Sequence, residues 1–67
     1  MNEAVDIFKL QQHYESRSFS ELRVLAQEAH EKFMYAILHN DELGAKTSSR
    51  DINLIFSVID DKIKAYK

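Results

Sequence analysis

Six consecutive apolar residues, Phe33–Leu38, restrict the fold more than any other stretch of this chain. They close a longer segment, about Phe19–His39, in which apolar residues recur at the spacing of an α-helix. On a helix with about 3.6 residues per turn, six such side chains in a row point in every direction. The segment must therefore be covered from more than one side, and we expect it to be the central helix.

The scarcity of turn-forming residues makes a β-sheet fold unfavourable. The chain has one glycine and no proline, whereas hairpins and bulges usually need these residues. With 67 residues it forms one domain at most, and a domain of this size hides only about 60% of its unfolded surface. The sequence predicts a single small all-α domain over 1–67.

Three helices are predicted, over about 2–15, 19–39 and 49–66. Asn2 is the expected N-cap of the first, whose apolar residues share one arc. Ser18 and Glu21 have the spacing of a capping box, which predicts the start of the second. Its apolar stripe consists of Leu22, Leu25, Ala26, Ala29, Phe33, Ala36 and Ile37.

A loop is expected to join the second and third helices. Asn40 or Gly44 would supply a left-handed residue at the exit, and Ser48 with Asp51 would cap the last helix. That helix has a narrow apolar stripe made of Ile52, Ile55, Phe56, Ile59, Ile63 and Tyr66. We expect the last two helices to form an antiparallel hairpin on which the first helix docks.

Five large apolar residues fall outside these stripes: Val24, Tyr35, Leu38, Leu54 and Val58. One interpretation is that the first helix covers some of them, since every surface carries scattered apolar residues. The interpretation we favour is that they form an interface, because so short a chain lacks core. This predicts a protein partner, a homodimer that completes a helical bundle, or both.

Composition and charge exclude several classes of partner and location. The chain has no cysteine, so no disulfide supports it, and its formal charge is −2. Its nine Lys and Arg residues are scattered among eleven acids, which disfavours direct nucleic-acid binding. No apolar run approaches the ~20 residues that span a bilayer, and the N-terminus does not resemble a signal peptide. We expect a cytoplasmic protein that does not bind membranes.

No pattern in the sequence indicates a catalytic or metal site. His30-Glu31 begins a string whose second histidine, in a zinc protease, would occupy the position of Met34. A calcium loop over His39–Arg50 would need oxygen ligands where Leu43 and Arg50 stand. There is no Gly-rich phosphate loop, serine elbow or cysteine nucleophile. We predict no catalytic residues, no metal and no cofactor.

Two resemblances concern the last helix. Ser57 and Asp61 match the first and last positions of the Ser-Gln-Glu-Leu-Asp signature of small sporulation phosphatases, although the three residues between them differ. Asp51–Ile59 resembles the Ile/Leu-rich helix of small enterobacterial connector proteins linked to biofilm and acid responses. Because two unrelated families fit one helix, the pattern assigns the chain to neither.

The sequence therefore predicts a small, non-enzymatic regulatory or adaptor protein that acts through an apolar helical surface. The alternative is an accessory of bacterial phospho-signalling, either phosphatase-like or a connector that acts on a response regulator or sensor kinase. It would use Asp61, or His30 with the neighbouring Lys32. A third possibility is an accessory of a DNA-binding complex that itself makes little contact with DNA.

Overall fold

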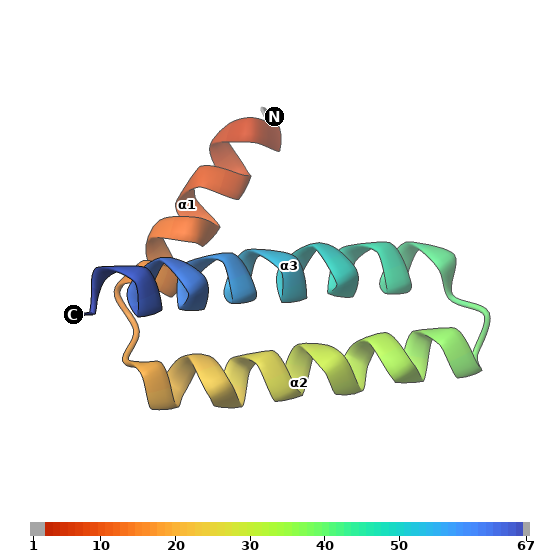
Figure 1. Ribbon diagram of the computed structural model, residues 1–67. Coiled ribbons are helices and arrows are strands. Elements are labelled where there is room, and N and C mark those ends of the chain that lie inside the picture. The colour runs from red at the N-terminus through yellow and green to blue at the C-terminus, as the bar shows by residue number, and fades with distance from the viewer. Residues whose placement is uncertain (1–2, 67) are drawn as a thin grey trace.

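The computed structural model describes residues 3–66, with side chains from Asp6 onward. These residues form three helices and no strand, as predicted: α1 (Glu3–Glu15), α2 (Phe19–Leu38) and α3 (Glu42–Ala65) (Figure 1). The expected N-cap of α1, Asn2, lies outside the described residues. The predicted bounds of α1 and α2 agree with the structure to within one residue at each end.

The antiparallel hairpin of α2 and α3 is the body of the molecule, and α1 packs obliquely on α3 (Figure 1). One core joins the three helices, with further apolar residues partly buried around it. Its buried members are Tyr14, Leu22, Ala26, Ala29, Ile55 and Val58. Four residues of the predicted α2 stripe are buried, namely Leu22, Ala26, Ala29 and Ala36, whereas Ile37, the last residue of that stripe, is exposed.

The start of α2 is fixed by the predicted capping box. The Glu21 N–H donates to the Ser18 hydroxyl oxygen at 3.2 Å, and the Ser18 N–H donates to a Glu21 carboxylate oxygen at 3.2 Å. The hydrogen bond from the Ser18 backbone N–H is the main reason why the pKa of the Glu21 carboxyl is lowered, and the Ser18 side chain lowers it further. Arg17 adds an exposed ion pair with Glu21 at 3.4 Å.

The reversal between α2 and α3 is much shorter than the sequence predicts. Asn40 has a φ of 55°, so it supplies the left-handed exit, and the Asp41 N–H donates to the Ala36 carbonyl at 2.8 Å. The Asp41 carboxylate then accepts from the Gly44 N–H at 2.9 Å and caps α3. Asp41 thus closes the end of α2 with its backbone N–H and caps the start of α3 with its side chain.

The predicted start of the last helix, near residue 49, is wrong, because α3 begins at Glu42. Asp41 and Glu42 stand at the positive end of the α3 dipole, where acids are favourable, and not at the negative end of α2. Gly44 lies within the first turn of α3, where a Cβ would collide with the capping carboxylate of Asp41. Ser48 is not a cap but a buried residue inside α3.

Within the described residues, none of the three helices is both long and apolar enough to span a membrane.

Candidate functional site

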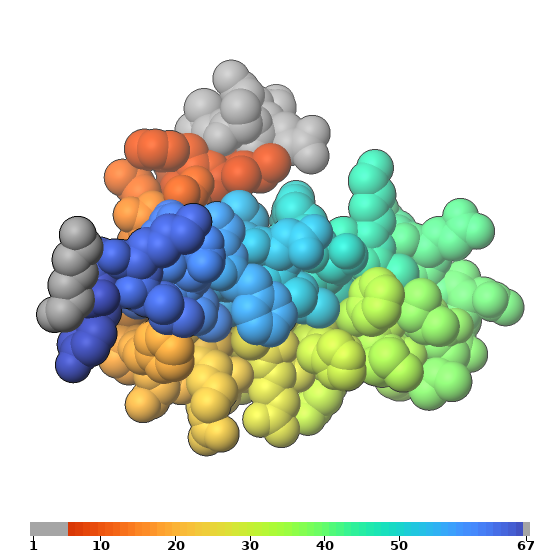
Figure 2. Space-filling model, in the orientation of Figure 1, coloured from red at the N-terminus to blue at the C-terminus, as the bar shows by residue number. Residues whose placement is uncertain are grey.

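Figure 2 shows the side of the hairpin that α1 leaves uncovered, where α2 meets α3. An apolar groove lies between the two helices on this side. We call this surface the open face. Its main hollow measures about 550 Å³ and continues into a second of about 400 Å³ near the end of α3. The apolar residues of the two hollows are Phe19, Ala26, Ile52, Phe56, Ile59, Ile63 and Tyr66.

Helical periodicity explains why these residues gather on one side. In α3, Ile52, Ile59 and Ile63 lie within one broad arc, and Ile55, which is 1% exposed, marks the line that faces α2. Phe56 is the next residue and points about 100° further round. The stripe is therefore wider than a single neighbouring helix can cover, and its outer part forms the open face.

Large side chains on the open face remain accessible to solvent. Phe19 is 53% exposed, Phe56 56% and Ile63 55%. Small soluble proteins rarely expose a contiguous apolar patch unless it binds something. Helical periodicity in the sequence places Phe56 and Ile63 in the core stripe of the last helix, so it missed both as surface residues, and it gave Phe19 no place in either stripe. The sequence signal for this exposure is the width of the α3 stripe, because a chain with so few helices has little to cover it.

The polar residues that line the open face are basic or neutral. Arg23, Gln27 and His30 lie along α2 beside the main hollow, and Lys62 borders the second hollow. Among the described residues, no acid lines either hollow. The groove therefore combines an apolar floor with a polar rim, in which Arg23 of α2 and Lys62 of α3 are the cations.

Two residues of the predicted interface are covered within the chain. Val58 is only 2% exposed, and Leu54 is partly buried against the same core. The expectation that Val58 is displayed on the surface is wrong, because α1 packs on α3 and brings Tyr14 into this cluster. The first helix does cover part of the surplus, as the alternative interpretation proposed.

The other three predicted interface residues are exposed but lie apart from one another. Val24 lines a hollow between α1 and α2, together with His13 and Arg17. Tyr35 stacks on His39 near the reversal, with ring centroids 4.1 Å apart. Leu38, the last residue of α2, is 77% exposed. The structure thus does not join the five predicted residues into one surface, and their role in binding stays a prediction.

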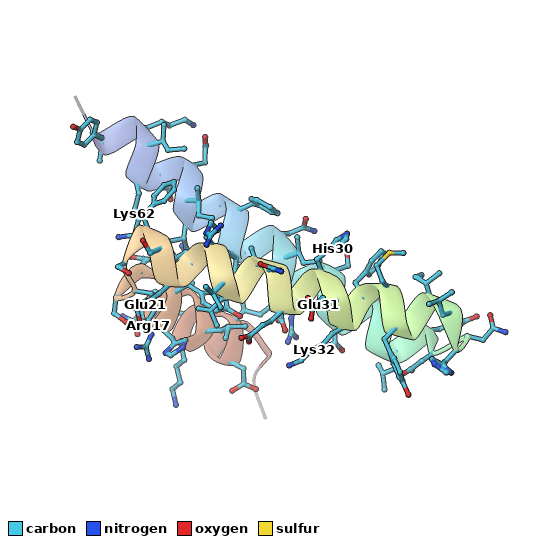
Figure 3. All side chains as sticks on the ribbon, turned by 90° about the horizontal axis from the view of Figure 1, so that it is seen from below. Arg17, Glu21, His30, Glu31, Lys32 and Lys62 are labelled. Carbon is cyan, nitrogen blue, oxygen red and sulfur yellow. The ribbon has the colours of Figure 1, made fainter. Side chains whose placement is uncertain are left out.

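The residues considered for phosphate chemistry are also separated. Figure 3 shows His30 and Lys32 on opposite sides of α2, with Glu31 between them. His30 borders the open face, whereas Asp61 borders a hollow with Glu15 and Val58. Within the described residues, no three His, Asp or Glu side chains are grouped as a metal site would require.

Tyr14 is the buried titratable group of the core. Its burial raises the pKa of the hydroxyl, and the nearby negative charge of Asp51 raises it further, while Arg50 lowers it. Because Tyr14 belongs to α1 and its side chain is buried in the core that it shares with the hairpin, this side chain is part of what holds α1 in place.

The chain was also compared with known proteins. No family model, no curated protein and no solved structure matches it.

Proposed function

We propose that this protein is a small non-enzymatic adaptor or regulator that works by burying its open face against another polypeptide chain. The observation that carries the proposal is the exposure of Phe19, Phe56 and Ile63 along a single groove. An apolar groove between two helices is a common receptor for a further helix, whose apolar face enters it. Aromatic side chains such as Phe56 are typical anchors of such interfaces.

The chemistry of the groove favours binding over catalysis. Its polar groups are a guanidinium, an amide, an imidazole and an ammonium group, all at the rim of an apolar floor. A general acid or base acts within about 3 Å of a reacting group and is usually oriented by a second residue. Among the residues that the structure describes, no carboxylate lines the groove beside His30 to take that role.

Site-specific photo-crosslinking in the native cell tests the proposal. A photoreactive phenylalanine analogue at position 56 is expected to crosslink to a polypeptide, because it replaces an aromatic ring that the partner covers. The matched control carries the analogue at Lys46, which is exposed in the same helix and points away from Ile55.

A crosslinked protein band at position 56 and none at position 46 supports the proposal. Equal labelling at both positions, or no crosslink at position 56 in a chain of normal helicity, overturns it. The analogue differs little in shape from the native ring, so loss of folding is not expected and circular dichroism verifies this.

A further inference from the structure

We propose that the open face is covered by the open face of a second copy, in a four-helix bundle whose two-fold axis runs along the helices. In this arrangement α2 of each copy lies against α3 of the other. The inference rests on the proposed function and identifies the polypeptide that fills the groove.

The core of the single chain is small. Leu22, Ile55 and Val58 are the largest side chains that are fully buried, and the three other buried residues of α2 are alanines. A domain of this size usually needs a further source of stability, and the absence of cysteine excludes disulfides. A second copy is the partner that is present whenever the chain is made.

The exposed apolar surface is long. Met34 and Ile37 follow His30 at helical spacing and are both exposed, so the surface continues along α2 beyond the groove. It therefore extends along most of the hairpin, from Phe19 near one end to Ile37 near the other. An identical hairpin has the length and the apolar surface to cover it.

The two edges of the open face carry different charged groups. The α2 edge carries Arg23 and His30. On α3, Asp60 lies one turn from both Phe56 and Ile63, and it pairs with the exposed Lys64 at 2.9 Å. One edge thus carries the cation Arg23, and the other carries Asp60 together with its ion-pair partner Lys64.

These charges select the direction of the two-fold axis. With the axis along the helices, Arg23 of one copy faces the end of α3 that carries Asp60 in the other, because both residues lie toward the same end of the antiparallel hairpin. With the axis across the helices and α2 packed on α2, the basic edges would face each other. Like charges in an interface are unfavourable, so the first arrangement is preferred.

Two measurements test the inference, beginning with mass and geometry. Sedimentation at micromolar concentration is expected to give twice the mass of one chain. The chain has no cysteine, so Leu43→Cys, at an exposed position beside the reversal, provides one spin-label site per copy. Labels at the same end of the bundle would lie roughly 10–20 Å apart, whereas labels at opposite ends would lie about 30 Å apart or more.

The second measurement is a charge swap across the interface. Arg23→Glu and Asp60→Arg are each expected to weaken the dimer by about tenfold, since each change affects two symmetric pairs. The double variant restores opposite charges and is expected to recover most of the affinity. Lys32→Glu and Asp61→Arg make the same charge changes away from the open face and are expected to have little effect.

The outcomes distinguish this inference from the proposed function. A chain that stays monomeric at all concentrations, yet crosslinks through position 56 to a different protein, overturns the dimer and leaves the adaptor proposal standing. A dimer with labels about 30 Å apart or more, or a double variant no better than the single ones, overturns the axis direction and the charge pairing. Folding of each variant is verified by its helical signal.

Discussion

The two sides of α3 contain the same kinds of residue but have different surroundings. On one side, Leu54 and Val58 pack in a cluster with Tyr14 of α1. On the other, Phe56 and Ile63 are also large and apolar, yet the described part of the chain leaves each of them more than half exposed. Residue type therefore does not decide which side of α3 becomes core. That decision depends on where the 13 residues of α1 dock.

A core substitution should affect this comparison most. Ile55→Ala is expected to lower the free energy of unfolding by about 2–5 kcal/mol, because it removes most of a side chain from the tightest part of the core. The loss should appear at every protein concentration, as measured by urea denaturation. A loss below about 0.5 kcal/mol, which is typical of surface sites, would contradict the packing of α2 on α3.

The open face should respond differently from the core. Phe56→Ala is expected to change stability little in dilute solution and to reduce it increasingly as concentration rises, because the proposed dimer would bury Phe56. Thermal unfolding at several concentrations measures this. Phe8→Ala, at an exposed phenylalanine of α1, is the matched control and should show no such dependence. If the unfolding temperatures of the wild type and of Phe56→Ala changed equally with protein concentration, the proposed role of the open face would be contradicted.

The capping box holds the part of α2 where Phe19 begins the open face. Ser18→Ala is expected to cost about 1 kcal/mol, since it leaves the Glu21 N–H without its acceptor. Chemical denaturation measures the loss, and Ser20→Ala, an exposed serine inside the helix, is the control. If both serines gave the same result, the cap would not stabilise α2.

The smallest expected effect concerns alkaline pH and the covered side of α3. Because the pKa of Tyr14 is raised on folding, its contribution to stability is complete below pH ~10, and it is lost as the pH rises through the folded value. Stability measured at pH 8 and at pH 11 should therefore fall less in Tyr14→Phe than in the wild type. The same substitution at the exposed Tyr35 should leave the wild-type slope unchanged.

The local features of the fold could be predicted from the sequence. The capping box at Ser18 needs only two residues at fixed spacing, and the stripe around Leu22 needs only the helical repeat. The early start of α3 was missed because Gly44 and the acids before it were interpreted as the signs of a loop. They instead form the first turn of a helix, in which glycine makes room for the Asp41 carboxylate.

The candidate site depended on three-dimensional information that periodicity lacks. The angle about the α3 axis separates Val58 from Phe56 by about 200°, but periodicity alone does not say which of them a neighbour covers. The structure supplies that answer through Tyr14. The sequence therefore predicted that an apolar surplus exists and was wrong about Val58 as one of its exposed members.

The turn at Asn40 and Asp41 also limits how this protein can change over evolutionary time. Each helical residue inserted into the first turn of α3 would rotate the rest of α3 by about 100° relative to α2, and a two-residue insertion would move Leu54 and Val58 toward the place of Phe56. Substitutions that keep the left-handed conformation at Asn40 and the capping carboxylate at Asp41 would preserve this geometry, whereas such insertions would exchange the buried and the accessible sides. Deliberate insertions at this point would therefore yield proteins of nearly the same composition with a different exposed apolar surface.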